Sequence, residues 1–495
     1  MFFSSRRLLK SGYNFGKLQG GNYSGPVEKA ELPDKVIIPL KQGFSAETQC
    51  LVKKGDHVRA GQIIGRDDHT WSSPVHSSIN GVVEYFESFM EGHEPHYGVV
   101  IRRDHKDERG YVPIPTAGSA DKSAEEISEI LYLAGVTALG STGIPSLHHT
   151  SDLKLEEVKG LVINGLSGEP FSLPQERLVG GRVKDFITGI SILAKLFQLE
   201  NNIHLAFAKS ATIATEVKAS ALKGLNVHTF ENKYPFDMDI MVSELVRGPK
   251  VPDGGTPSES GLVVLTIQDV LHVYEAVVIG KPLIERTIAV GGPGTEQSRL
   301  VKVAVGSPVE WLLLGNLKKG AEERILVGGA MRGVPLESAR HPVERTFSAL
   351  TLLEENRERE FLYFLRPGFS VLSYSREYIS SFLRSFTRRA ETNIQGEGRA
   401  CIYCSYCEDA CPRKLVPHLY SRYIRHDMAE EAIKYGLESC IDCGLCTFVC
   451  PSKIPLFEDI LEGKKVLEER GRWSHVSGFK KLEKVDPEAS TEATP

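Results

Sequence analysis

Eight of the nine cysteines stand between positions 401 and 450, and their spacing is the strongest chemical signal in the chain. They form two copies of one motif, in which three cysteines separated by two residues each are followed by a Cys-Pro pair. The first copy contains Cys401, Cys404, Cys407 and Cys411, and the second contains Cys440, Cys443, Cys446 and Cys450. Thiolates at this spacing are typical ligands of 4Fe–4S clusters.

The motif also predicts how the cysteines are shared between two clusters. Three closely spaced cysteines hold three iron corners of one cluster, and the cysteine before the proline reaches the other cluster. We therefore expect cluster I on Cys401, Cys404, Cys407 and Cys450, and cluster II on Cys440, Cys443, Cys446 and Cys411. Structural zinc usually takes two separated pairs of ligands and does not explain a motif written twice. Redox chemistry of one CxxC pair would leave six of these cysteines without a role.

The segment between the two motifs must position the cysteine loops. Residues 417–439 show helical pairing at i and i+4, with Leu419 facing Tyr423 and Ala429 facing Ile433, and Gly436 then ends a helix. We therefore expect a helical scaffold for the clusters. Two such clusters carry electrons without substrate chemistry, so a donor and an acceptor must lie elsewhere.

The rest of the chain divides into zones that differ in their pattern of apolar and turn residues. These zones predict a multidomain protein with α/β, β and α parts. Turn residues separate short β-like runs in the first zone, where Asn80-Gly81 predicts a hairpin. Helical and strand patterns alternate in the second zone, where apolar periodicity predicts helices at 124–135 and 183–197. The expected ranges are an N-terminal arm (1–33), a β-sandwich (34–105), an α/β domain (120–285), a small β domain (286–345), a helical domain (353–475) and a disordered tail (476–495).

Composition excludes several classes of function. A net charge of −5 over 495 residues gives no concentrated basic surface, so we expect no nucleic-acid partner. The most apolar stretch, 261–280, contains Gln268, Asp269, His272 and Glu275, so we expect no transmembrane span. No apolar segment follows the arginines of the first residues, and we therefore expect no export signal. Clustered thiols in a reducing compartment then indicate metal binding and not disulfides.

Several segments resemble, in order, the RnfC family of the Rnf complex, an ion-translocating ferredoxin:NAD oxidoreductase of membranes. They are 35–45 (KVIIPLKQGFS), 273–278 (VYEAVV), 280–286 (GKPLIER) and the double cysteine motif. A related subunit of the sodium-pumping NADH:quinone reductase shares the front domains but lacks the clusters. The resemblance implies a lipoyl-like β-sandwich, an α/β flavin/NADH-type domain, a β-grasp domain and a helical ferredoxin domain. It also implies a peripheral position on the cytoplasmic side of the membrane, with ferredoxin or an iron–sulfur subunit and other subunits as partners.

The same resemblance implies FMN and NADH contacts in the α/β domain, but the matching loops are altered. The family's glycine-rich loop reads ALGSTGIPSLHH at 138–149, and its NGAECEPY segment reads NGLSGEPF at 164–171, with Ser167 in place of an acid. A third loop, at 234–239, has lost two glycines and gained Asp237 and Asp239. The implied contact residues are Gly140, Gly143, Pro145, Asn164 and Glu169. Carboxylates near a phosphate lower its affinity.

Three functions follow from these observations. The first is an electron-transfer subunit of an Rnf-type complex, an oxidoreductase that passes electrons through two 4Fe–4S clusters between NAD(H) and ferredoxin or partner subunits. The second is a relay subunit with no flavin or NADH activity, in which the α/β domain serves assembly. The third is a soluble flavin-dependent reductase subunit with the same architecture. Flavin content separates the first from the second.

Overall fold

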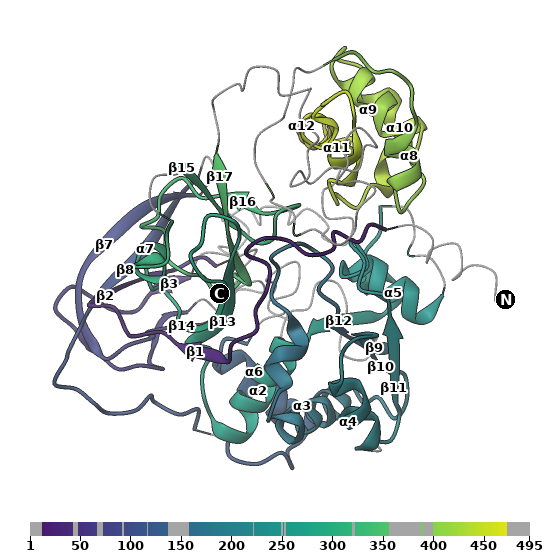
Figure 1. Cartoon of the computed structure of the whole chain (residues 1–495). Helices are drawn as coiled ribbons and strands as arrows, with labels where there is room; N and C mark the ends of the chain where they lie inside the picture. The colour runs from purple at the N-terminus through teal and green to yellow at the C-terminus, as the bar shows by residue number, and fades with distance from the viewer. Residues whose placement is uncertain are drawn as a thin grey trace, which may run out of the picture.

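The computed structural model describes residues 12–42, 48–66, 73–91, 94–115, 117–136, 158–220, 222–248, 251, 254–318, 322–355, 387, 390 and 399–472. Three layered units and a helical unit are visible, with the helical unit at the C-terminal end of the described chain (Figure 1). No helix among the described residues is long and apolar enough to cross a membrane.

The first unit is a β-sandwich of a four-stranded and a three-stranded sheet. The larger sheet runs β2-β8-β7-β4 and the smaller β3-β5-β6. Their strands are β2 (Lys35–Pro39), β3 (Gln49–Cys50), β4 (His57–Val58), β5 (Ile63–Arg66), β6 (Val75–His76), β7 (Gly81–Glu91) and β8 (Glu94–Arg103). The hydrophobic side chains between the sheets, such as Val36, Ile64 and Ile101, are fully buried.

The hairpin expected at Asn80-Gly81 is wrong, because β6 and β7 belong to different sheets. The Asn80 side chain accepts a hydrogen bond from Ala60 N and donates to the carbonyl oxygens of Asp107 and Arg109. A Cβ at Gly81 would lie 2.1 Å from the Arg102 carbonyl oxygen. Asn80 therefore ties loops together at a crossing between sheets, and Gly81 allows the close approach of the next strand.

The second unit is the predicted α/β layer, with an all-parallel sheet in the order β11-β10-β9-β12. Its strands are β9 (Gly160–Gly165), β10 (Ile203–Ala208), β11 (Leu225–Phe230) and β12 (Leu262–Thr266). Its helices are α2 (Ala124–Leu133), α3 (Val183–Leu196), α4 (Ile213–Ala219), α5 (Asp239–Arg247) and α6 (Ile267–Tyr274), with 3₁₀ turns η2 (Gln175–Val179) and η3 (Pro257–Ser260) and a π-helical turn η4 (Glu275–Ile279). The predicted helices at 124–135 and 183–197 are confirmed to within two residues.

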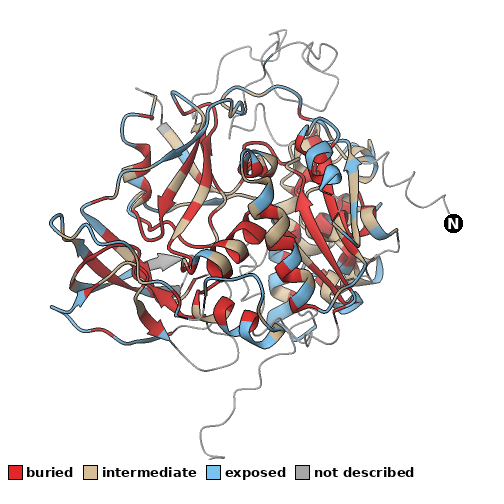
Figure 2. Cartoon of the chain, turned by 90° about the horizontal axis from the view of Figure 1, so that it is seen from below, coloured by how far each residue is buried: buried red, intermediate tan, exposed pale blue. Residues whose placement is uncertain are grey.

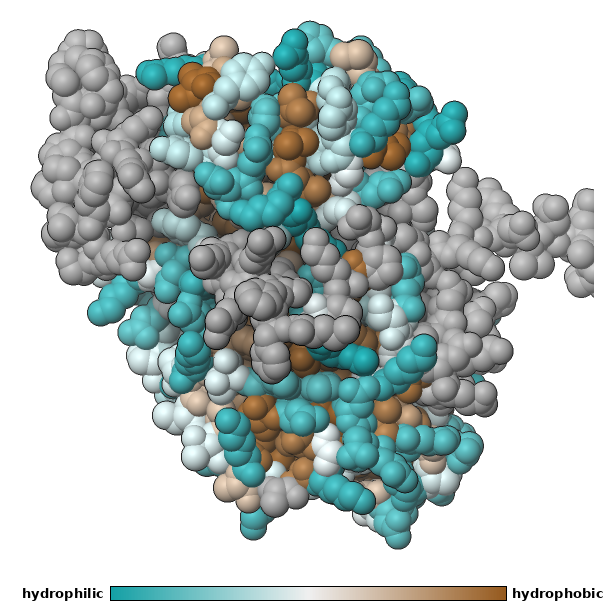
Figure 3. Space-filling model, turned by 90° about the vertical axis from the view of Figure 1, so that its right-hand side faces the viewer, coloured by the Kyte–Doolittle hydropathy of each residue, from teal (hydrophilic) through white to brown (hydrophobic). Residues whose placement is uncertain are grey.

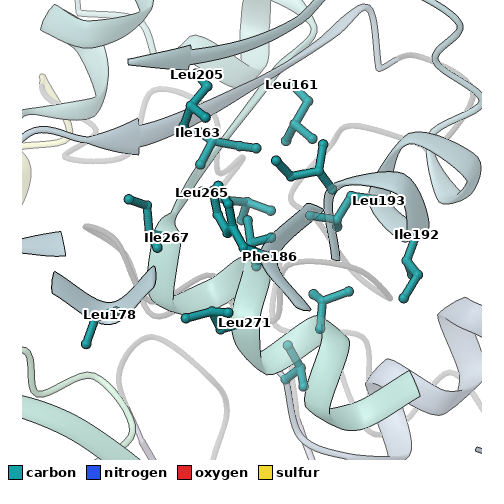
Figure 4. Packing of buried hydrophobic residues seen from close by; sticks show 14 of the residues in the cluster. Leu161, Ile163, Leu178, Phe186, Ile192, Leu193, Leu205, Leu265, Ile267 and Leu271 are labelled. Atoms are coloured by element: carbon teal, nitrogen blue, oxygen red, sulfur yellow. The ribbon is translucent and has the colours of Figure 1, made fainter. Parts of the chain in front are cut away.

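The core of this unit lies between the sheet and the helices α3 and α6. Alternate residues of β9 and β12, among them Ile163 and Leu265, meet Phe186 of α3 and Leu271 of α6 in one cluster (Figure 4). The helix faces turned toward the sheet are the buried ones (Figure 2). The opposite face of the sheet packs against α5.

Phe186 is fully buried, so replacing it with alanine should cost a large part of the stability of this unit. We expect Phe186→Ala to lower the free energy of unfolding by about 3–5 kcal/mol, because the lost ring leaves a cavity. Urea denaturation followed by circular dichroism measures the change. The matched control is Lys184→Ala on the exposed side of α3, for which we expect a change within about 0.5 kcal/mol. Equal effects of the two substitutions would contradict the packing described.

The third unit is a six-stranded mixed sheet in the order β1-β14-β13-β17-β15-β16. Its elements are β1 (Val27–Lys29), β13 (Glu285–Gly291), β14 (Arg299–Ala304), α7 (Val309–Leu313), β15 (Glu322–Val327), β16 (Val334–Pro335) and β17 (Ala349–Glu355). Strands β1 and β17 come from outside the range 286–345 expected for this sheet. The sheet thus recruits the N-terminal arm, which runs parallel to β14.

The fourth unit is a compact bundle of short helices that carries the cysteine loops. The helices are α8 (Tyr406–Ala410), α9 (Pro417–Ile424), α10 (Ala429–Lys434), η7 (Leu437–Ser439), α11 (Leu445–Val449) and α12 (Leu456–Glu469). Gly463 of α12 lies against Ile424 of α9, where a Cβ would come within 2.4 Å, so these two helices pack closely. The helices predicted between the motifs are confirmed, and Gly436 adopts the left-handed conformation that ends the second of them.

The N-terminal arm crosses the other units. The backbone of Tyr13 exchanges two hydrogen bonds with the backbone of Tyr234 in the α/β unit. The centroid of the Phe15 ring lies 5.1 Å from that of the Phe448 ring in α11. Further along, the Gly20 carbonyl oxygen accepts a hydrogen bond from Gly292 N in the six-stranded sheet. The arm, drawn in purple in Figure 1, therefore connects three units.

Candidate iron–sulfur centre

Each set of four cysteines predicted from the crossed motif lines one pocket. Cys411, Cys440, Cys443 and Cys446 surround a pocket with about 400 Å³ of empty space, together with apolar side chains such as Leu415 and Ile460. Cys401, Cys404, Cys407 and Cys450 surround a second pocket of about 340 Å³. Cys411 thus lies apart from the other cysteines of its own motif and beside those of the second, and Cys450 makes the reverse exchange.

The two cysteine loops fold alike because the same positions adopt left-handed backbone. In the first loop these are Tyr403 and Ser405, and in the second Asp442 and Gly444. Each loop leads into a one-turn helix, α8 or α11, at whose end the fourth cysteine leaves toward the other pocket. The repeated motif is therefore a repeated structure that wraps three cysteines around one point.

The arrangement of the thiols fits a cluster better than a single ion. No group of three His, Cys, Asp or Glu side chains within the described ranges is close enough to hold one metal ion. A zinc site brings four ligands to about 2.0–2.3 Å from one ion, whereas in a cubane each cysteine binds a different iron and the sulfurs lie farther apart. The eight cysteines are free thiols. Four spread cysteines around an apolar pocket are the donor set that a 4Fe–4S cluster needs.

Burial keeps four of these thiols, those of Cys407, Cys440, Cys443 and Cys446, protonated in the absence of metal. It raises the pKa of Cys407 to about 11 and that of Cys440 to about 12, and it raises the pKa of Cys443 and Cys446 as well. The cause is desolvation, which disfavours the thiolate. Iron binding must therefore displace a proton from each thiol, and the buried thiols are otherwise poor nucleophiles.

The cluster II pocket faces the α/β unit. Ile441, between two of its cysteines, packs into the cluster formed by α5 and the sheet. The hydroxyl of Tyr234 donates a 2.6 Å hydrogen bond to the carbonyl oxygen of Cys443. A fully buried ion pair joins Arg413, next to Cys411-Pro412, to Glu244 of α5, with a 2.5 Å distance between Nη1 and Oε1.

The cluster I pocket lies toward the surface. Ile402 and Tyr403, in the loop that carries its first two cysteines, are 65% and 62% exposed. Apolar side chains reach the surface of the upper, cluster-bearing part of the molecule (Figure 3). The two pockets therefore differ in position, one directed inward and one outward.

Of the five residues with implied flavin contacts, Gly140, Gly143 and Pro145 lie outside the described residues. Asn164 ends β9, where its side-chain amide donates to the carbonyl oxygen of Asp237 and its side-chain oxygen accepts from Leu166 N. Glu169 accepts hydrogen bonds from the backbone of residues 331 and 332 and pairs with Arg332 at 2.9 Å. Both side chains thus hold the protein itself together.

The carboxylate expected to repel a phosphate does not stand free in a pocket. Asp237 Oδ2 accepts hydrogen bonds from Gly168 N and Glu169 N, and burial raises the pKa of Asp237 to about 6. The hydroxyl of Ser167 donates to the Leu173 carbonyl oxygen and accepts from Gln175 N. The altered residues Ser167 and Asp237 therefore stabilise the loop after β9 through these hydrogen bonds. Among the described residues of this unit, the side chains named for a flavin already have protein partners.

A large cavity lies elsewhere, with about 1770 Å³ of empty space that is open to solvent. It lies between the helices α4 and α6 and the strands β13 and β14. Its charged lining mixes both signs, with Arg182 paired to Glu275 and Lys302 to Glu285. Neither Asn164 nor Glu169 is among the described residues that line it.

Sequence reasoning missed the charged residues around cluster II. Lys464 is 2% exposed on α12, where its ammonium donates to the Cys440 carbonyl oxygen and to Asp442. A signal was present, because Lys464 lies in the apolar stripe that contains Ile460 and Leu467. Arg413 and Tyr234 carried no comparable signal, since their partners are distant in sequence.

The fold and the two cysteine pockets are those of an iron–sulfur electron-transfer protein, and comparison with known proteins agrees with this class. Residues 400–454 match the family described as the 4Fe-4S dicluster domain, so the chain is an iron–sulfur electron-transfer protein. Residues 132–275 match the Nuo51 FMN-binding domain, and residues 12–106 match the RnfC barrel sandwich hybrid domain. The protein is therefore multidomain, as expected, and contains a domain of the FMN-binding type.

Two of the most similar relatives are C subunits of ion-translocating oxidoreductase complexes. The C subunit of the proton-translocating ferredoxin:NAD(+) oxidoreductase complex of Clostridium ljungdahlii is 26% identical over 413 residues, which is 82% of each chain. The C subunit of the ion-translocating oxidoreductase complex of Rhodobacter capsulatus is 27% identical over 458 residues, 91% of this chain and 81% of that one. The chain is thus similar over most of its length to the C subunits of ion-translocating oxidoreductase complexes, and the predicted resemblance to the RnfC proteins is confirmed.

Solved structures show a looser likeness in fold. The NAD+-reducing [NiFe]-hydrogenase in its H2-reduced state superposes with a TM-score of 0.44 at 12% identity, over 74% of this chain and 64% of that one.

Proposed function

We propose that this protein is the peripheral iron–sulfur subunit of an Rnf-type complex and that electrons cross it through two 4Fe–4S clusters. The observation that supports this most is the sorting of eight cysteines into two pockets of four, with Cys411 and Cys450 exchanged between motifs. Each cluster, when bound, accepts and releases one electron at a time. The relatives are named as C subunits of proton- or ion-translocating complexes, one of them a ferredoxin:NAD(+) oxidoreductase, which supports a place beside other subunits of such a complex. We propose that this place is peripheral, on the cytoplasmic side of the membrane, with ferredoxin or an iron–sulfur subunit as electron-transfer partner.

The positions of the two pockets support an order of the two clusters along the electron path through the chain. Cluster II is joined to the α/β unit by Tyr234 and by the ion pair between Arg413 and Glu244, so it is the inner carrier. Cluster I, beside exposed Ile402 and Tyr403, is the outer carrier and exchanges electrons with a partner subunit. The cysteines hold the clusters, and the buried contacts keep the inner cluster at a fixed distance from the α/β unit.

The finer fold assignments belong to the same proposal. We assign the lipoyl-like fold to the first unit, the flavin/NADH-type fold to the α/β unit, the β-grasp fold to the six-stranded sheet and a helical ferredoxin fold to the cluster unit. The sheet orders and the helical scaffold of the cysteine loops support these assignments. We propose the domain ranges expected from the sequence, with β1 and β17 added to the sheet of the third unit.

A relay without flavin activity is the second candidate, and one observation favours it. Asn164 and Glu169, the implied flavin residues that the structure describes, are both engaged by protein partners. In that case the α/β unit would hold the inner cluster in place, and electrons would enter from another subunit.

Analysis of the reconstituted full-length protein tests both candidates. We expect about eight iron and eight acid-labile sulfide per chain, because two cubanes contain that number. About four of each would mean that one pocket is not a cluster site. Bound FMN together with bleaching of the cluster absorbance by NADH would establish the NADH-oxidising function. Full clusters without flavin, reducible by dithionite and not by NADH, would establish the relay.

A further inference from the structure

The two cysteine loops share a backbone but differ in the charge buried behind them. Position 442 of the second loop carries an aspartate, whereas the equivalent position of the first loop carries the exposed Tyr403. Neither Lys nor Arg is among the described residues that line the cluster I pocket, where a His418 ring nitrogen lies 3.9 Å from the Cys407 sulfur. Cluster II, by contrast, has Lys464 behind it.

Lys464 is an unusual residue to bury. Its side chain is 3% exposed, and an ammonium removed from water costs several kcal/mol unless it finds partners. Those partners are both in the cysteine loop: the Cys440 carbonyl oxygen at 2.9 Å and Asp442 Oδ1 at 2.6 Å. The Cys440 sulfur is itself 3.6 Å from the same Asp442 oxygen. The ammonium, the carboxylate and the first cysteine of cluster II therefore form one buried group.

We infer that Lys464 and Asp442 form a charge pair that sets the reduction potential of cluster II, with Lys464 raising it and Asp442 lowering it. The inference rests on the proposed cluster sites. Reduction adds one negative charge to a cluster, and a buried cation beside a ligating cysteine stabilises the added charge, since charges interact strongly where water is excluded. The first loop carries Tyr403 at the position that Asp442 occupies in the second and cannot form the same charge pair there, so the chain can hold two chemically identical clusters at different potentials.

A second cation lies near cluster II. Arg413 lines the pocket, but its guanidinium is directed to Glu244 on α5, which neutralises its charge outside the cysteine loop. Lys464 differs because it contacts the loop at Cys440 itself. It is a positioning residue for the cluster, since it acts through the loop and its field and not as a ligand.

The test is a redox titration of the reconstituted full-length protein, followed by electron paramagnetic resonance, for Lys464→Met and Asp442→Asn. We expect Lys464→Met to make reduction of cluster II at least about tenfold less favourable, a negative shift of about 59 mV for one electron. Asp442→Asn should shift it in the positive direction. Asparagine suits the left-handed backbone at 442, so this variant should retain the fold. The signal of cluster II is identified as the one missing from Cys411→Ser.

The controls separate charge from packing. Lys464→Arg retains the charge and should leave the potential close to that of the parent, and Lys465→Met removes an exposed charge from the same helix and should have no effect. Shifts of the same sign for Lys464→Met and Asp442→Asn, or no shift in either, would overturn the inference. If Lys464→Met fails to assemble cluster II, the Asp442→Asn variant alone tests the inference: a positive shift of the potential supports it, and a negative shift or none overturns it. Parent protein without iron would overturn the cluster assignment as well, whereas parent protein with two clusters and unmoved variants would overturn only the role of this pair.

Discussion

Cys411→Ser is expected to lose cluster II and to keep cluster I, although Cys411 belongs to the first motif. The reason is that Cys411 lines the pocket of Cys440, Cys443 and Cys446 and leaves the pocket of its own motif to Cys450. Iron content should fall from about eight to about four per chain, and half of the cluster absorbance should be lost. Iron analysis and visible spectroscopy of the reconstituted variant measure the change.

The reciprocal variant and a neutral one complete this experiment. Cys450→Ser should lose cluster I and keep cluster II, and the double variant should contain almost no iron. Cys50→Ser, which alters the one exposed cysteine outside the motifs, should retain both clusters. The crossed assignment fails if Cys411→Ser and Cys404→Ser remove the same electron paramagnetic resonance signal.

The second large effect is expected from Arg413→Met, which removes one partner of the buried ion pair between the cluster unit and α5. Glu244 would then be left as an unpaired carboxylate that is fully buried. Breaking a buried pair in this way costs about 3–5 kcal/mol, because the remaining charge has lost its compensation. Differential scanning calorimetry should show a lower unfolding temperature, and limited proteolysis should release the cluster unit from the rest of the chain.

A surface pair in the same unit provides the matched control for Arg413→Met. Arg425 and Asp459 are 2.9 Å apart, but the arginine is 49% exposed. Arg425→Met should therefore change the stability by no more than about 1 kcal/mol. The double replacement Arg413→Met with Glu244→Leu should recover much of the loss, since apolar packing can substitute for a buried pair. Equal losses in the single and double variants would show that the guanidinium acts through something other than Glu244.

The grouping of the cysteines into two sets of four could be predicted from the sequence, because their spacing encodes local geometry. A loop of three cysteines can wrap only one cluster, and the Cys-Pro pair directs the fourth ligand away, so the exchange of Cys411 and Cys450 follows from the motif alone. The helices at 183–197 and 417–439 were predictable for a similar reason, since their apolar periodicity is local.

Contacts between distant segments could not be predicted in this way. Asp237 appeared to add negative charge to an anion-binding loop, but in the structure it accepts hydrogen bonds from Gly168 and Glu169. Its partners lie far from it in the chain, and nothing in the local pattern indicates them. The strands β1 and β17 also join a sheet far from them in sequence, β1 at its edge beside β14 and β17 inside it between β13 and β15. Pairing between remote segments leaves no periodicity of its own.

The N-terminal arm imposes an order on how the molecule is made. Residues 13–20 leave the ribosome first, yet their partners are Tyr234, Gly292 and Phe448, the last of which is synthesised near the end of the chain. At about 5–20 residues per second, the arm waits on the order of tens of seconds for its final contact. The arm therefore cannot pack against Phe448 before nearly all of both cysteine motifs exists. Both cysteine motifs are synthesised only in the last part of that interval, so the contact of the arm with Phe448 forms no earlier than the loops that hold the clusters.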